Sequence, residues 1–258
     1  MTVSEARAHL GVDDPLALQH AIARFSDDLR PGVVRARDAA VRRLARFHAE
    51  EARLASMAET ERELAARGLV IVAGVDEVGR GALAGPVSAG ACVLPLDAVI
   101  PGLRDSKTLS PDARERLDVS IRRTAIALAV SHVPAPVIDG IGIAKATRLA
   151  MTRAITDLDI PVDHVLVDGT DTALPFPSTA IVRGDSTVRV IAAGAIIAKV
   201  ARDRLMCELH EQYPEYGFRD HKGYGCATHL RAIHDRGPSE VHRMSFSPCG
   251  EHPLFPVE

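Results

Sequence analysis

The chain has no tryptophan, and aromatic residues make up only 3% of its 258 residues. Valine, isoleucine, leucine and alanine must therefore fill the core, and a hydrophobic content of 47% is enough for one large domain plus a small appendage. Long apolar runs are also missing, because the longest, Val190–Ala198, is far too short to span a bilayer. We expect no signal peptide and no membrane segment, and therefore a cytoplasmic protein.

Cysteines in metal-binding or disulfide spacing are absent as well. The four cysteines are scattered and form no CxxC motif, so the sequence indicates neither a disulfide framework nor a zinc site. Positive charge is not in excess: the net charge is −3, which taken alone argues against a nucleic-acid partner. Only four of the 31 basic residues are lysines, so each lysine is a candidate for a role that needs a compact ammonium group.

Residues 1–67 are expected to form a helical N-terminal extension. The apolar spacing over Val33–Arg67 predicts one or two helices. Within this segment, Arg30–Arg46 holds six arginines against one acidic residue, Asp38. Two interpretations stay open, a solvated helix face and an arm that contacts phosphates.

From Gly68 onward, β-type and helical patterns alternate, which predicts a mixed α/β domain over residues 68–212. A loop-rich module with one short helix follows over residues 213–258. The expected strands are Leu69–Val75, Pro86–Leu94, Ala125–Val133, Val162–Val167 and Thr179–Val182. The expected helices are Asp112–Arg123, Ile143–Leu158, Val188–His210 and Ala227–Asp235.

Acidic residues follow three of these strands. Asp76 and Glu77 come directly after the first, Asp168 directly after the fourth, and Asp185 follows the fifth. A carboxylate at the end of a buried strand is costly unless it is paired or binds a metal. Oxygen ligands of this kind suit Mg²⁺ or Mn²⁺, and two such ions can support displacement at a phosphate. The sequence therefore predicts a site for divalent cations at one edge of the sheet.

The segment Gly79-Arg80-Gly81 directly follows the first acidic pair. Its flanking glycines leave the backbone N–H and C=O groups open to a ligand that approaches closely. Backbone groups that reach a sugar edge can detect a 2′-hydroxyl, which distinguishes RNA from DNA. The sequence thus places a candidate ribose sensor beside a candidate metal site.

Together these segments resemble the ribonuclease HII family, from about Gly68 to the last 15 residues. Seven blocks carry the resemblance, in the family's order. They are Ala73–Gly81, Asp105–Ser110, Val167–Gly169, Arg183–Ser186, Ile191–Asp203, His221–Gly225 and His242–Pro248. The chain departs from the family pattern at Ala195 and Cys226, where many members have serine and threonine.

The resemblance implies an RNase H-like mixed five-stranded sheet flanked by helices, with a small helical C-terminal module. It implies a metal-dependent type 2 ribonuclease H that cleaves the RNA of RNA–DNA hybrids and incises 5′ of ribonucleotides embedded in duplex DNA. By analogy, four acidic residues would be catalytic and would hold two Mn²⁺ or Mg²⁺ ions: Asp76, Glu77, Asp168 and Asp185. The residues implied in substrate binding are Gly79, Arg80, Gly81, Lys107 and Tyr224. The implied products carry 5′-phosphate and 3′-hydroxyl ends.

Three rival interpretations compete with this one. The first is the sister family, ribonuclease HIII. The Gly79–Gly81 segment and an aspartate at position 185 argue against it. The second is a catalytically silent module that binds hybrids, which would tolerate loss of an acidic residue, although all four are present. The third is a DNA-cutting nuclease or transposase of the same fold, which would need no ribose sensor. We expect a monomer. The sequence shows no clear motif for binding a sliding clamp, although the tail Leu254–Glu258 is loose enough to be one, so protein partners stay open.

Overall fold

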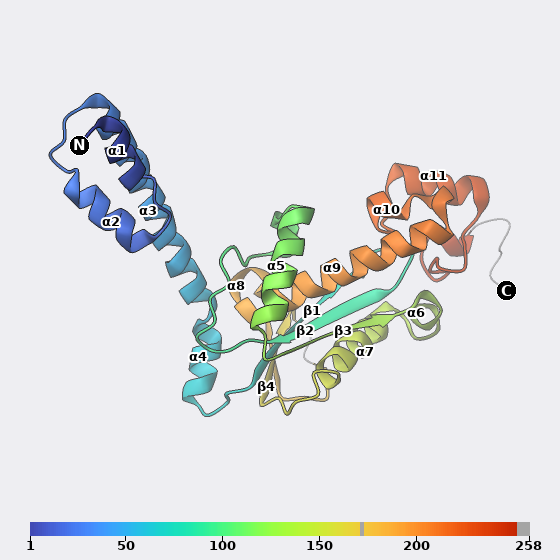
Figure 1. The fold of residues 1–258 in the computed structure, drawn as a ribbon. Helices are drawn as coiled ribbons and strands as arrows, with labels where there is room; N and C mark the ends of the chain where they lie inside the picture. Colours follow the sequence, from blue (N-terminus) through green and yellow to red (C-terminus); the bar gives the residue numbers. More distant parts are fainter. Residues whose placement is uncertain (171–172, 252–258) are drawn as a thin grey trace. The chain divides into compact units, whose positions relative to one another are not determined.

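The structure is a computed structural model that describes residues 1–170 and 173–251. The chain divides into two compact units, Met1–Ser56 and the remainder from Met57 onward (Figure 1). The boundaries expected at residues 67 and 212 stay predictions. No helix among the described residues is long and apolar enough to cross a membrane.

The N-terminal unit consists of three helices around a small apolar core. They are α1 (Val3–His9), α2 (Pro15–Arg24) and α3 (Pro31–Met57), which extends one residue into the second unit. Helix α1 begins with a capping box between Thr2 and Glu5, and the Asp14 carboxylate caps α2. The buried core residues are Ala6, Leu10, Leu18, Ala21, Phe25, Val33 and Ala40.

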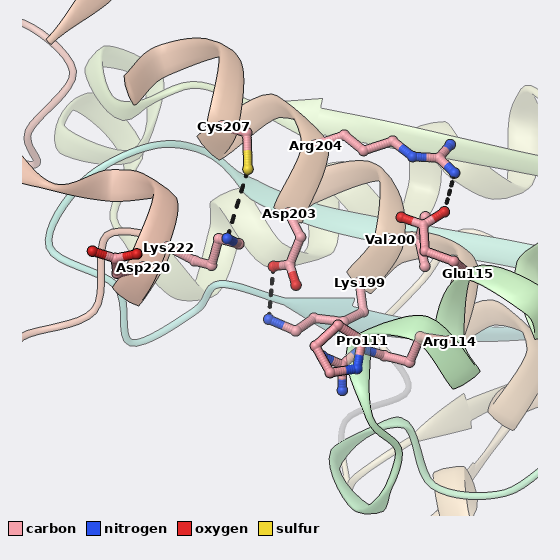
Figure 2. A pocket seen from close by; sticks show the side chains of 10 residues that line it. All are labelled: Pro111, Arg114, Glu115, Lys199, Val200, Asp203, Arg204, Cys207, Asp220 and Lys222. Carbon is pink, nitrogen blue, oxygen red and sulfur yellow. Dashed lines mark hydrogen bonds and ion pairs between the residues drawn. The ribbon is translucent and has the colours of Figure 1, made fainter. Parts of the chain in front are cut away.

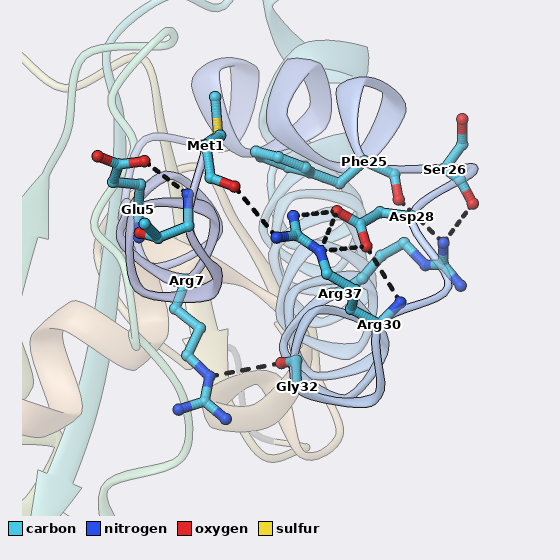
Figure 3. A network of polar contacts seen from close by, with 10 residues as sticks. Met1, Glu5, Arg7, Phe25, Ser26, Asp28, Arg30, Gly32 and Arg37 are labelled. Carbon is cyan, nitrogen blue, oxygen red and sulfur yellow. Dashed lines mark hydrogen bonds and ion pairs between the residues drawn. The ribbon is translucent and has the colours of Figure 1, made fainter.

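Half of the arginines in Arg30–Arg46 hold this unit together. Arg30 pairs with Asp28, and Arg37 donates to the Phe25 and Ser26 carbonyl groups (Figure 3). Arg43 donates to two carbonyl groups of the segment that follows α1. The other three are exposed and recur on one face of α3, with no polar partner recorded among the described residues. We call them the exposed arginine row: Arg35, Arg42 and Arg46.

The second unit is built on a five-stranded mixed sheet with the order β3-β2-β1-β4-β5. The strands are β1 (Val72–Val78), β2 (Val87–Val93), β3 (Ala127–Val133), β4 (His164–Asp168) and β5 (Ser178–Ile181). β1 lies at the centre, antiparallel to β2 and parallel to β4. All five expected strands are therefore present. The first begins and ends three residues later than expected, so Asp76 and Glu77 lie within β1 rather than after it.

Helices cover both faces of this sheet (Figure 1). Helix α9 (Arg189–Gln212) packs closely on the first face, where glycines make room for it: a Cβ on Gly74 would lie 2.2 Å from the Val190 carbonyl carbon. Helix α7 (Ile143–Thr156) covers the other face, where its alanines join Ala73 and Val75 in an apolar core. Side chains alternate along a strand, so Asp76 shares the α9 face with Gly74.

The remaining helices lie around this sheet and in the C-terminal module. Helix α5 (Pro111–Thr124) contacts α9, and the Ser110 side chain caps its N-terminus. The C-terminal module contains α10 and α11 and joins the sheet through the loop after β1. The other helices are α4 (Glu59–Ala66), η1 (Ser106–Thr108), α6 (Ala135–Ile141), α8 (Gly184–Thr187), η2 (Pro214–Tyr216), α10 (Phe218–His221), α11 (Ala227–Arg236) and η3 (Cys249–Glu251). The tail Leu254–Glu258 lies outside the described residues.

Candidate active site

Three aspartates meet at one edge of the sheet. The parallel register pairs Val75 with Val167, so Asp76 and Asp168, the next residues, lie side by side on neighbouring strands. Asp185 lies on the short helix α8, and its backbone N–H donates to Asp168 Oδ1 at 3.3 Å. One carboxylate oxygen of each aspartate lies within 4.8 Å of the others. The structure thus brings together three of the four acidic residues expected to bind metal.

The electrostatics of this cluster suit a divalent cation. Asp76 is buried, and the pKa of its carboxyl lies well above the usual range because of burial and the neighbouring charges of Glu77 and Asp168. Burial also raises the pKa of Asp168. The cluster contains no histidine or cysteine, so its donors are oxygens only. Buried, mutually repelling carboxylates are the ligand set that hard ions such as Mg²⁺ and Mn²⁺ prefer.

Glu77 lies apart from the three aspartates. Neighbouring residues of a strand point to opposite faces, so Glu77 shares the face that α7 covers. Its carboxylate is 3.6 Å from the guanidinium of Arg80, and burial raises its pKa. Glu77 and Asp168 line the same cavity of about 210 Å³. Its role as a metal ligand stays a prediction, and that role would require its carboxylate to turn toward Asp168.

Lys107 contacts the acidic cluster directly. It lies on η1, where the Asp105 carboxylate accepts the Lys107 backbone N–H at 2.8 Å. Its ammonium group is 2.7 Å from Asp185 Oδ2, and this hydrogen bond raises the pKa of Lys107. The expected contact with a substrate phosphate stays a prediction. Because its ammonium group contacts Asp185, Lys107 offsets part of the negative charge of the cluster.

The candidate ribose sensor is assembled from two distant segments. The Gly79 N–H donates to the Tyr224 hydroxyl at 3.2 Å, across 145 residues of sequence. Arg80 and Gly81 are exposed, and a Cβ on Gly81 would meet no atom within 4 Å. Gly79 differs, because its φ is +82° and a Cβ there would lie 2.1 Å from Arg202 Nε. The protein itself therefore requires glycine at 79 but leaves open space at 81.

Two buried arginines that the motif analysis did not single out hold this loop. Arg202 and Arg243 are fully buried, and both donate to backbone carbonyl groups between Gly79 and Pro86. Both residues lie inside blocks that carry the family resemblance. A sequence does not distinguish a buried arginine from a surface one, so only their position in those blocks could have pointed to them.

Histidines of the C-terminal module support Tyr224. His229 is buried, and its Nδ1 lies 3.0 Å from the Tyr224 carbonyl oxygen, while its Nε2 lies 3.1 Å from Nε2 of His242. The Ser239 N–H donates to Nδ1 of His242 at 2.9 Å. This fixes the tautomers, because His242 then donates to His229 and His229 to the tyrosine carbonyl.

A cavity of about 460 Å³ lies between α5, α9 and α10 (Figure 2). Its charged lining residues are Arg114, Lys199, Arg204, Lys222, Glu115, Asp203 and Asp220. Most of these charges are already paired: Lys199 Nζ is 2.7 Å from Asp203, and Arg204 pairs with Glu115. The cavity is therefore a nearly balanced polar surface, and we assign it no ligand.

The five-stranded mixed sheet, with aspartates on its central parallel strand pair and helices on both faces, has the architecture of the RNase H-like class. The comparison with protein families narrows this class: the model of the family "Ribonuclease HII" matches residues 73–249. The chain belongs to the ribonuclease HII family, which makes it a metal-dependent ribonuclease H of type 2. The expected family, fold and enzyme class are therefore confirmed.

Individual relatives agree with this placement. The chain is 44% identical to a ribonuclease HII from Geobacillus kaustophilus over 252 residues, 94% of this chain and 91% of the relative. It is 48% identical to a ribonuclease HII from Bacillus cereus over 199 residues, 77% of each chain. Among solved structures, ribonuclease H2 from Pyrococcus horikoshii superposes with a TM-score of 0.60 at 26% identity, covering 70% of this chain and 95% of that one.

Proposed function

We propose that this enzyme hydrolyses the RNA strand of RNA–DNA hybrids and also incises duplex DNA 5′ of single embedded ribonucleotides. The products would carry 5′-phosphate and 3′-hydroxyl ends. The observation that carries the proposal is the juxtaposition of three aspartates, within 4.8 Å of one another, with an exposed glycine loop that contacts Tyr224. One part suits phosphate chemistry and the other suits ribose recognition.

The three aspartates, together with Glu77, would hold two divalent ions, Mg²⁺ or Mn²⁺. Ions bound there would supply Lewis acidity toward the scissile phosphate and neutralise its charge. Asp76 is the central ligand in this proposal, because it is buried and lies on the middle strand, beside Asp168 on the neighbouring strand. Lys107 would orient Asp185 and hold a phosphate oxygen near the cluster.

Ribonucleotide recognition would come from the loop after β1. Arg80 and Gly81 are exposed residues, and their backbone N–H groups would be donors that a 2′-hydroxyl can accept from. Tyr224, a residue that is 37% exposed, would pack its ring against the sugar or base at the RNA–DNA junction. All-DNA duplexes would bind through phosphate contacts but would lack the hydroxyl that fixes the scissile phosphate over the aspartates.

A panel of three end-labelled duplexes of one sequence tests this function. One is an RNA–DNA hybrid, one carries a single ribonucleotide, and one is all DNA; each is incubated with the enzyme and Mn²⁺ or Mg²⁺. We expect cleavage of the first two and none of the third. Asp157, an exposed aspartate at the end of α7, provides a matched control, since Asp157→Asn should cleave like the unmodified enzyme. Efficient cleavage of the all-DNA duplex would contradict the proposal.

A further inference from the structure

The buried guanidinium groups of Arg202 and Arg243 hold the Gly79–Pro86 loop from the protein interior. Arg243 donates to the carbonyl oxygens of Gly79 at 2.7 Å, Arg80 at 2.9 Å and Gly85 at 3.0 Å. Arg202 donates to those of Pro86 at 2.9 Å and Ala84 at 3.2 Å. Five carbonyl groups of one short loop thus point inward toward two fully buried cations.

The peptide geometry determines what the loop presents on its outer side. In a trans peptide unit, the C=O of one residue and the N–H of the next point in opposite directions. The single cis bond among the described residues is Ser247-Pro248, so both peptide units that follow Gly79 are trans. When Arg243 draws in the carbonyl groups of Gly79 and Arg80, the N–H groups of Arg80 and Gly81 must point away from it. Both residues are exposed, and neither N–H has an acceptor recorded within the described part of the chain.

The energetics indicate that this arrangement serves more than stability. Arg202 and Arg243 form no ion pair among the described residues. Carbonyl dipoles and the rings of Tyr224 and Phe246 contact them, and the carboxylates of Asp203 and Asp139 favour their charges without contact. Burying a cation without a carboxylate costs several kcal/mol of desolvation, and an apolar side chain of similar volume is often at least as stabilising. A fork with several donors at fixed angles is, in contrast, well suited to aligning consecutive carbonyl groups.

We propose that Arg243 is a positioning residue for ribose recognition: it aligns two consecutive peptide planes so that the N–H groups of Arg80 and Gly81 face the substrate. Arg202 supports the other end of the loop and the Tyr224 ring, whose centroid is 5.5 Å from its guanidinium carbon. The inference rests on the proposed function, because it specifies how the loop would recognise the 2′-hydroxyl. It assigns the loop the role of hydrogen-bond donor.

The test compares Arg243→Gln and Arg243→Lys with Tyr216→Phe. The tyrosine control removes a buried hydrogen bond within the same module, from Tyr216 to the Gly237 carbonyl, and leaves the loop contacts intact. Two quantities are measured at a temperature at which circular dichroism shows all variants folded. They are kcat/KM for a duplex with one ribonucleotide and Kd for the same duplex made entirely of DNA.

For Arg243→Gln we expect kcat/KM to fall by about tenfold or more, as loss of one well-aligned hydrogen bond predicts, while Kd for the all-DNA duplex stays within about twofold. Arg243→Lys keeps the positive charge without the planar guanidinium group, and its kcat/KM should lie between those of Arg243→Gln and the unmodified enzyme. It also keeps the test available if the glutamine variant does not fold. A kcat/KM equal to that of Tyr216→Phe, or a parallel loss of all-DNA binding, would overturn the inference. Failure of the unmodified enzyme to incise at the ribonucleotide would instead refute the proposed function.

Discussion

Replacing Asp76 by asparagine should stabilise the metal-free protein while removing its activity. The substitution keeps the size of a buried side chain but deletes the charge at the centre of the aspartate cluster. At a separation of 4.8 Å and an effective dielectric constant of about 20, each pair of ionised carboxylates repels by about 3.5 kcal/mol. Asp76 faces two such partners. Partial protonation and the ammonium group of Lys107 offset part of this repulsion, so we expect a gain of about 2 kcal/mol.

The gain should depend on pH in a defined direction. The pKa of Asp76 in the folded protein lies well above its ordinary value of 3.8, so the folded state binds this proton more tightly than the unfolded state does. The destabilisation by the Asp76 charge is therefore absent below pH 3.8 and grows as the pH rises through the folded pKa. The stability difference between Asp76→Asn and the unmodified protein should be near zero at pH 4 and largest at pH 8.

Thermal unfolding in EDTA, followed by circular dichroism, measures this effect. A gain of about 2 kcal/mol corresponds to a rise in Tm of about 4–8 °C for a unit of this size. Adding Mn²⁺ should raise the Tm of the unmodified protein and have little effect on the variant, because the central ligand is gone. Asp157→Asn is the control and should leave Tm and the response to Mn²⁺ unchanged. A variant that is less stable than the unmodified protein at pH 8, or that responds equally to Mn²⁺, would refute the reasoning.

Three further predictions concern other parts of the molecule. Gly81→Ala should keep its Tm, because a Cβ there meets no protein atom, yet lose most incision at a ribonucleotide; Gly79→Ala should instead lower the Tm, and equal behaviour of the two would contradict the site geometry. Burial lowers the pKa of His229 to about 4 and of His242 to about 3. Since the unfolded state takes up these protons first, urea unfolding should show stability falling below about pH 6.5, by about 1.4 kcal/mol per pH unit for each histidine; a slope unchanged in His229→Asn would contradict this. Replacing the exposed arginine row by alanine should weaken binding of an RNA–DNA hybrid and reduce its salt dependence if the row contacts phosphates, whereas unchanged values would identify it as a solvated face.

Much of the fold could be predicted because its elements are locally encoded. Each strand of the sheet is a short β-rich run bounded by turn residues, and Ser110-Pro111 marks the start of α5 as a cap followed by proline. The first strand was placed too early, because its apolar run ends at Val75 while its hydrogen-bonded ladder continues to Val78. Backbone pairing with β2 extends the strand through two charged residues that a hydrophobicity pattern excludes.

The site residues that strand pairing brings together are predictable from the sequence. Those whose positions depend on tertiary packing are not. Asp76 and Asp168 meet because the apolar runs before them, which end at Val75 and Val167, pair in parallel register. The separation of Glu77 from the aspartates follows from side-chain alternation within β1, which became visible only with the true strand boundary. The contacts of Arg243 join residues more than 150 positions apart, and no local pattern encodes them.

Net charge was the least informative quantity. The value of −3 includes four acidic residues of the candidate site, whose charge two divalent ions would cancel. It also averages over a chain in which exposed basic residues gather on one helix, as in the exposed arginine row. The partner of such a protein is therefore indicated by where its charges lie, not by their sum.

The position of the cut in a duplex with one ribonucleotide tests the central claim most directly. Both strands are end-labelled, the enzyme acts in Mn²⁺, and the product is sized against ladders that distinguish the two sides of the ribonucleotide. We predict a single incision on its 5′ side, leaving a 3′-hydroxyl and a 5′-phosphate, and none with Asp168→Asn. Incision at the 3′ side, cutting at deoxynucleotides elsewhere, or full activity of Asp168→Asn would contradict the account.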